Sequence, residues 1–179
     1  MTTTAPTVMD VPTRRTATFL FTDIVGSTEM LTMLGEETWL RALRDHNTVV
    51  LDVVDRNGGD MLKFLGDGWM ITFTCPRDAL DAAVGIQRSH AVDPSPDGFR
   101  VRIGVHTGVA LEEAVQGDLV GKDVVLAARI AREAAPNEIV ASADVVDVLG
   151  SNDERFDGGR IAHLKGLGPH LVFGVRWAA

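Results

Sequence analysis

The stretch FLFTDIVGST (residues 19–28) decides how this chain folds and where its chemistry lies. It belongs to a short, nearly continuous apolar run over residues 16–25, which is typical of a strand buried on both faces of a sheet. Asp23 stands at the end of this strand, and the glycine turn that follows predicts a helix with Ser27 or Thr28 as its N-cap. The segment therefore delivers a carboxylate to the end of a buried strand.

A second carboxylate lies in KFLGDG (residues 63–68). Two β-like runs, residues 61–65 and 69–74, are separated by a Gly-Asp-Gly turn, which predicts a hairpin with Asp67 at its tip. Carboxylate oxygens are the hard ligands that Mg²⁺ and Mn²⁺ prefer, and glycine lets phosphates approach the backbone closely. Asp23 and Asp67 together indicate a metal site that handles phosphates.

The remaining pattern mixes hairpins with crossovers, which favours an α/β sandwich with a mixed sheet. Apolar periodicity and stop signals predict helices over residues 36–56, 76–91, 121–135 and 142–149, and strands over residues 100–109, 138–141, 155–165 and 171–177. In the strand over residues 100–109, the alternation predicts that Val101, Ile103 and Val105 face the same side of the sheet. The helix over residues 121–135 should carry an apolar patch of Val124, Val125, Ala128 and Ile130, and Ser142 should cap the helix that ends at residue 149. Residues 1–15, rich in Thr and Pro, predict a flexible tail before a single domain over residues 16–179.

Composition narrows the classes of protein to consider. The 179 residues suffice for one ordinary domain, and the formal net charge of -8 argues against broad binding to nucleic acid or to a membrane surface. Cys75 is the only cysteine, which excludes an intramolecular disulfide and argues against a zinc cluster. There is no signal-peptide pattern, and no apolar run approaches the roughly 20 residues of a membrane span. We expect a soluble, cytoplasmic protein.

Four segments in order carry a family resemblance. They are FTDIVGST (residues 21–28), KFLGDG (63–68), RIGVHTG (102–108) and AAR (127–129). Together they resemble the catalytic domain of the class III adenylyl and guanylyl cyclases, over about residues 16–179. The resemblance implies a ferredoxin-like core with a mixed, mainly antiparallel sheet flanked by helices. It also implies a head-to-tail homodimer in which both subunits build each of two active sites.

The resemblance also implies roles for individual residues at the metal. By this similarity Asp23 and Asp67 ligate two divalent ions per site, Mg²⁺ or Mn²⁺, and the carbonyl of Ile24 helps. Two ions suit the expected reaction, because one acidifies an attacking hydroxyl while the other holds the departing phosphates. Asp23 and Asp67 are therefore expected to be both metal ligands and catalytic residues.

Four further positions match substrate-handling residues of the family. Lys63 resembles the lysine that reads the purine, Asp118 its partner, Arg129 the transition-state arginine, and Lys165 a lysine that contacts the terminal phosphates. Lys63 only donates hydrogen bonds and suits adenine N1, whereas the Asp118 carboxylate accepts and suits the adenine 6-amino group. These residues predict an adenylyl cyclase that converts ATP into 3′,5′-cyclic AMP and pyrophosphate.

One position departs from the family pattern. An asparagine is expected four residues before Arg129, where it would position the ribose, but Val125 stands there and can make no hydrogen bond. The alternatives are a guanylyl cyclase or another palm-like phosphoryl transferase, and a degenerate cyclase domain that serves as a nucleotide-binding or dimerisation module. The alternative for Arg129 is a structural role on the helix surface, in an ion pair with Glu133 at i+4.

Overall fold

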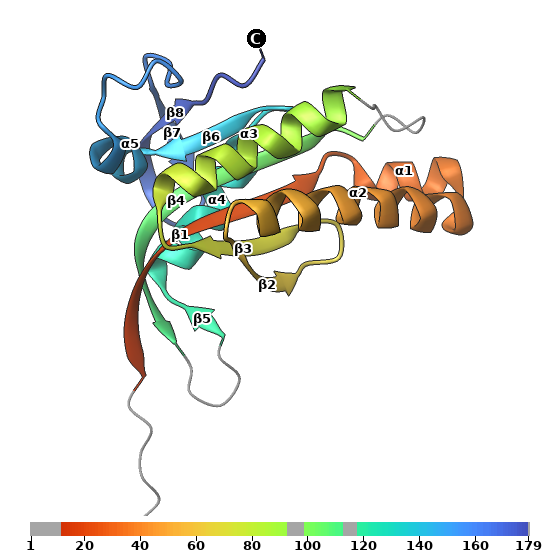
Figure 1. Ribbon diagram of the computed structural model, residues 1–179, viewed down its shortest axis with the longest axis horizontal. Helices are drawn as coiled ribbons and strands as arrows, with labels where there is room; N and C mark the ends of the chain where they lie inside the picture. Colours follow the sequence, from red (N-terminus) through yellow and green to blue (C-terminus); the bar gives the residue numbers. More distant parts are fainter. Residues whose placement is uncertain (1–11, 93–98, 113–117, 179) are drawn as a thin grey trace, which may run out of the picture.

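The computed structural model describes residues 12–92, 99–112 and 118–178, which form one eight-stranded sheet and five helices (Figure 1). In chain order the elements are β1 (Thr13–Ile24), α1 (Ser27–Leu34), α2 (Glu36–Arg56), β2 (Asp60–Phe64), β3 (Trp69–Phe73), α3 (Pro76–Val92), β4 (Val101–Glu112), β5 (Leu119–Val120), α4 (Lys122–Glu133), β6 (Ile139–Ser142), α5 (Ala143–Leu149), β7 (Arg160–Leu164) and β8 (Gly168–Gly174).

The sheet has the strand order β2-β3-β1-β4-β6-β8-β7, and β5 pairs with β4 beside this path. The pair β4–β6 is parallel and the other pairs are antiparallel, which confirms the predicted mixed, mainly antiparallel sheet. β1 and β4 form its centre and stay paired from Thr13 and Glu112 to Ile24 and Val101. Because this pairing continues beyond the apolar run, β1 begins three residues before the predicted strand.

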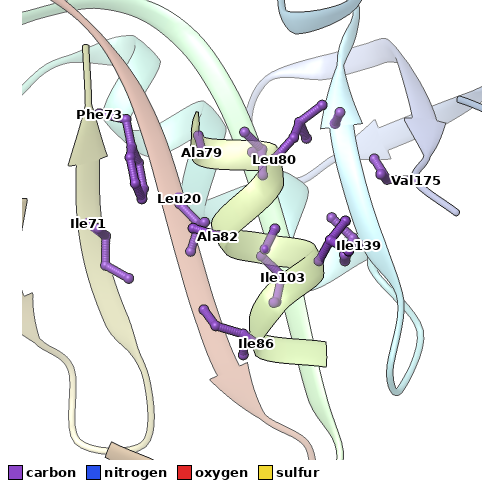
Figure 2. Close-up of a cluster of buried hydrophobic side chains, with 14 of the residues drawn as sticks. Leu20, Ile71, Phe73, Ala79, Leu80, Ala82, Ile86, Ile103, Ile139 and Val175 are labelled. Carbon is purple, nitrogen blue, oxygen red and sulfur yellow. The ribbon is translucent and has the colours of Figure 1, made fainter. Parts of the chain in front are cut away.

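Helices cover both faces of the sheet. Figure 1 shows α2 and α3 on one side and α4 on the other. In the larger core cluster, drawn in Figure 2, α3 contributes Leu80 and Ile86 to the same apolar layer as Leu20 of β1 and Ile103 of β4. Val101 and Val105 belong to this cluster as well, so the predicted inward row of β4 is confirmed.

The opposite face of the sheet is packed against α4. Because side chains alternate along a strand, Phe19 and Phe21 of β1 point to this face, where they cluster with Ala127 and Ala131 of α4. Gly104 of β4 makes the close approach of this helix to the sheet feasible, since a Cβ there would lie 2.3 Å from the backbone nitrogen of Ala131. The sheet is therefore a rigid platform with α4 fixed tightly on one face.

One of the two predicted helix caps is wrong, and the other is right in position but makes no side-chain cap. α1 begins after Gly26 with no side-chain cap, because the Ser27 hydroxyl donates to Asp67 instead. Ser142 is the N-cap residue of α5, as predicted, but its side chain does not cap the helix, because its hydroxyl lies 2.9 Å from Nδ1 of His106. In both cases the hydroxyl forms a hydrogen bond with a residue distant in the sequence and not with the backbone at the helix start.

The predicted apolar patch of α4 is only partly right. Ile130 is buried, but Val125 is 47% exposed, and the other buried side chains of the helix are Leu126, Ala127 and Ala131. The buried face is therefore rotated from the predicted one, and Val125 is left on a flank that lines a cavity. In the described part of the chain, no helix is long and apolar enough to cross a membrane.

Candidate active site

The two predicted metal ligands lie together where β1 ends. Asp23 is the penultimate residue of β1, and Asp67 lies in the turn between β2 and β3. This turn is held against the strand end by two hydrogen bonds: the Ile24 amide donates to the Asp67 carbonyl at 3.2 Å, and the Trp69 amide donates to Oγ1 of Thr22 at 3.0 Å. The hairpin therefore carries the second carboxylate to the first.

Gly68 permits this close contact. A Cβ at this position would lie 1.9 Å from the carbonyl oxygen of Thr22, far inside any real contact distance. Only a residue without a side chain fits between the turn and β1. The second glycine of the Gly-Asp-Gly pattern is therefore needed for more than the hairpin, because it lets the Asp67 turn pack against the strand that carries Asp23.

A cation accompanies Asp23. Arg102 lies directly opposite Asp23 in the β1–β4 register, and its Nε and Nη2 atoms each lie 2.6 Å from Oδ2 of Asp23. Both side chains are about three-quarters buried, at 28% and 27% exposure. Arg102 also donates from Nη1 to the carbonyl of Arg132, at 3.4 Å. Arg102 opens the RIGVHTG segment but was not among the predicted site residues, because the cross-strand register that pairs it with Asp23 is a tertiary feature.

The donor set at this end suits a hard divalent ion. Asp23, Asp67 and the Ile24 carbonyl offer oxygen ligands only, and Asp67 also lines a cleft of about 290 Å³ beside α1. Among the described residues, no group of three or more acidic, His or Cys side chains gathers closely enough to hold a metal by itself. Mg²⁺ is commonly bound through one or two carboxylates together with water and substrate phosphates. The residues present fit that pattern.

A second cluster forms around Lys63 and Asp118. Lys63 extends from β2 and Asp118 immediately precedes β5, and the Lys63 Nζ lies 3.1 Å from Oδ2 of Asp118. Both side chains line a cavity of about 370 Å³. Its other lining residues are Phe21, Leu65, Met70, Leu119, Val120, Val124, Val125, Ala128, Arg129 and Arg132. The structure thus brings together the two residues that the sequence assigned to reading the base.

Arg129 lies in the wall of the same cavity. It is half-buried on α4, one turn beyond Val125, whose apolar side chain faces the cavity too. Within the described chain Arg129 forms no ion pair, so the alternative pairing with Glu133 is wrong. Its guanidinium is available to a ligand in the cavity that Lys63 and Asp118 line.

Lys165 stands apart from both clusters. It is exposed in the turn between β7 and β8, at the edge of the sheet opposite β2, and it lines neither cavity. Within one chain, the predicted site residues therefore fall into three groups: the aspartates, the Lys63–Asp118–Arg129 cavity, and Lys165. The cleft beside Asp67 and the larger cavity have only Leu65 in common.

Comparisons with known proteins identify the family and the fold of the chain. The family model for the adenylate and guanylate cyclase catalytic domain matches residues 9–175. An uncharacterized protein of Mycobacterium tuberculosis is 33% identical over 129 residues, a match that covers 72% of this chain and 33% of the relative. The chain thus spans about a third of the length of this curated relative.

Two solved structures share the fold. The catalytic core of a rhodopsin-guanylyl cyclase with converted specificity, solved with ATPalphaS, superposes with a TM-score of 0.81 at 18% identity, covering 93% of this chain and 98% of that one. The adenylyl cyclase CyaB from P. aeruginosa gives 0.76 at 20% identity, covering 94% and 97%. The family model spans nearly the whole chain, and this chain therefore belongs to the adenylate and guanylate cyclase catalytic domain family.

Proposed function

We propose that this protein is an adenylyl cyclase that converts ATP into 3′,5′-cyclic AMP and pyrophosphate. The observation that carries the proposal is the Lys63–Asp118 pair, held at 3.1 Å in the cavity that Arg129 also lines. The pair presents one donor and one acceptor side by side, which matches N1 and the 6-amino group of adenine. Guanine presents an N–H and a carbonyl oxygen at these positions, so the same pair would oppose it. We also propose that the reaction takes place in the cytoplasm, where ATP is available.

The proposed chemistry divides between the two clusters. Bound Mg²⁺ or Mn²⁺ would lower the pKa of the ribose 3′-hydroxyl and neutralise the leaving pyrophosphate. Asp23 and Asp67 would hold these ions, with the Ile24 carbonyl beside them. Arg129 would neutralise charge on the reacting α-phosphoryl group, a contribution worth about 10³-fold or more for arginines in other phosphoryl-transfer enzymes.

The separation of the clusters supports a shared site in a homodimer. Asp67 lines one cleft, whereas Lys63, Asp118 and Arg129 line another, and the two share only Leu65. In a head-to-tail dimer, the aspartates of each subunit would lie against the proposed base-reading cavity of its partner. The dimer would therefore contain two active sites. The same assembly would bring Lys165 from its distant turn to the terminal phosphates.

The test is complementation between two inactive variants. Asp23→Ala removes a metal ligand and Arg129→Ala removes the phosphate cation, so each variant alone should lose nearly all cyclic AMP formation. In an equimolar mixture, random pairing leaves one intact site in each mixed dimer, so activity should recover to about a quarter of the wild-type level. A mixture of Asp23→Ala with Asp67→Ala is the matched control and should stay inactive. Mixed dimers that form without any recovery would rule out the shared site.

Val125 favours a second candidate, a degenerate cyclase domain that binds nucleotide without cyclising it. Precise orientation of reacting groups can lower the reaction barrier by up to about 7–11 kcal/mol. Val125 contributes nothing to this orientation, because it offers no hydrogen bond to the ribose. Purified protein that binds ATP with Mn²⁺ yet forms no cyclic product would establish this candidate. Cyclic GMP as the main product would instead establish a guanylyl cyclase.

A further inference from the structure

The larger cavity carries positive charge on an acidic protein. The chain has a formal net charge of -8, yet the lining of this cavity contains three cations, Lys63, Arg129 and Arg132, and one anion, Asp118. Since Lys63 is paired with Asp118, the surplus charge comes from the two arginines of α4. A hollow with this charge suits an anionic ligand, and the second arginine has no role in the function proposed above.

Arg132 is well placed to share that ligand with Arg129. Residues three and four apart lie on one face of a helix, so Val125, Arg129 and Arg132 form a single row along α4, and all three line the cavity. The Arg132 guanidinium is exposed, and within the described chain it makes no hydrogen bond or ion pair. The backbone carbonyl of Arg132 accepts a hydrogen bond from Arg102, which connects this end of the row to Asp23.

The two ends of this row differ in their capacity to donate hydrogen bonds. Val125 cannot hydrogen-bond a nucleotide, whereas Arg132 presents a planar fork of N–H donors that matches phosphate oxygens in a bidentate manner. Building on the proposed function, we propose that Arg132 is a substrate-binding residue that grips the phosphate chain of ATP together with Arg129. It thereby supplies part of the orientation that a polar residue at position 125 would give.

The first test compares three variants of the same protein. Arg132→Ala removes the fork, Arg132→Lys keeps the charge without the bidentate geometry, and Lys122→Ala removes an exposed cation of the same helix that does not line the cavity. We expect Arg132→Ala to weaken equilibrium binding of ATP with Mn²⁺ and to raise its KM by about tenfold or more, as for other charge-assisted phosphate contacts. Arg132→Lys should recover part of the loss. Lys122→Ala should stay within about twofold of wild type, as substitutions away from such contacts usually do.

The second test asks whether Arg132 offsets Val125. Val125→Asn should improve kcat/KM more in the Arg132→Ala background than in the wild type, because the two groups would serve the same orientation. Equal binding and equal KM for Arg132→Ala and Lys122→Ala would overturn the role of Arg132 while leaving the cyclase proposal intact. If the wild type binds ATP without cyclising it, the binding comparison still decides the matter. If the wild type binds no ATP at all, both proposals fail.

Discussion

The ion pair of Lys63 and Asp118 contributes little to the stability of the fold. Their side chains are 57% and 38% exposed, and exposed ion pairs contribute only about 0–1 kcal/mol to folding. Replacing both should therefore leave the fold intact. Under the proposed function, the same two groups would select the edge of the purine that docks, because one donates and the other accepts.

The base preference should follow these two side chains. In a double variant with Lys63→Glu and Asp118→Gly, or Asp118→Cys, each lost or mismatched hydrogen bond should cost on the order of 1–3 kcal/mol. We expect kcat/KM for ATP to fall by at least about tenfold and some activity with GTP to appear. Chromatography of both cyclic products from equal mixtures of ATP and GTP measures the ratio. An unchanged preference for ATP in a variant with the wild-type melting temperature would contradict the assignment.

At the scale of elements, sequence pattern predicted what is periodic and missed what depends on neighbours. The helix over residues 36–56 and the hairpin around Asp67 follow from local signals, and both occur as predicted. The predicted buried face of α4 is only partly right, because an open cavity on one flank leaves Val125 exposed, and periodicity cannot reveal a cavity. The Asp23–Arg102 pair needed the register of β1 against β4. The cap predicted at Ser27 or Thr28 is absent, because the Ser27 hydroxyl donates to Asp67, a partner 40 residues away that the local pattern cannot reveal.

The contact between α2 and α3 contains a pair of histidines that should make stability depend on pH. His46 Nδ1 lies 3.0 Å from His90 Nε2, and the two rings stack with their centroids 5.0 Å apart beside Phe99. Burial, reinforced by the neighbouring His90, lowers the pKa of His46 from 6.5 to about 3, and burial also lowers the pKa of His90. In the unfolded chain His46 regains its ordinary pKa. The unfolded state therefore binds more protons between about pH 6.5 and pH 3, and the folded state loses stability as the pH falls through this window.

Urea unfolding at pH 7 and pH 5 measures this effect. For the wild type we expect the free energy of unfolding to fall on the order of 1–2 kcal/mol between these pH values on account of His46. His46→Leu should flatten this part of the dependence, since leucine removes the titrating group, although repacking also shifts the absolute stability. His163→Gln, which alters an exposed histidine, is the control and should keep the wild-type slope. A His46→Leu slope equal to that of the wild type would show that the pair does not govern acid stability.

On the scale of the whole molecule, the proposed site residues of one chain fall into separate groups, and the two cavities beside them share only Leu65. Apolar side chains stay exposed around the cavity that Lys63 and Asp118 line: Leu65 at 49%, Val120 at 50% and Val125 at 47%. Apolar surface that gathers around a functional cavity is typical of a surface that another protein covers. Under the proposed function, a second copy of this chain would cover this surface and bring the aspartates of one subunit to the cavity of the other.

Activity should therefore depend on protein concentration. If both subunits build each site, cyclic AMP formed per chain should rise in proportion to concentration where monomers dominate and should level off where dimers dominate, by mass action. Sedimentation velocity over the same dilution series, in the same buffer with Mn²⁺ and ATP, gives the fraction of dimer at each point. The two curves should coincide, because the dimer would be the only active species. Constant activity per chain across a range where sedimentation reports monomers would show that one chain completes its own site, and Asp23 and Arg129 would then have to meet within a single subunit.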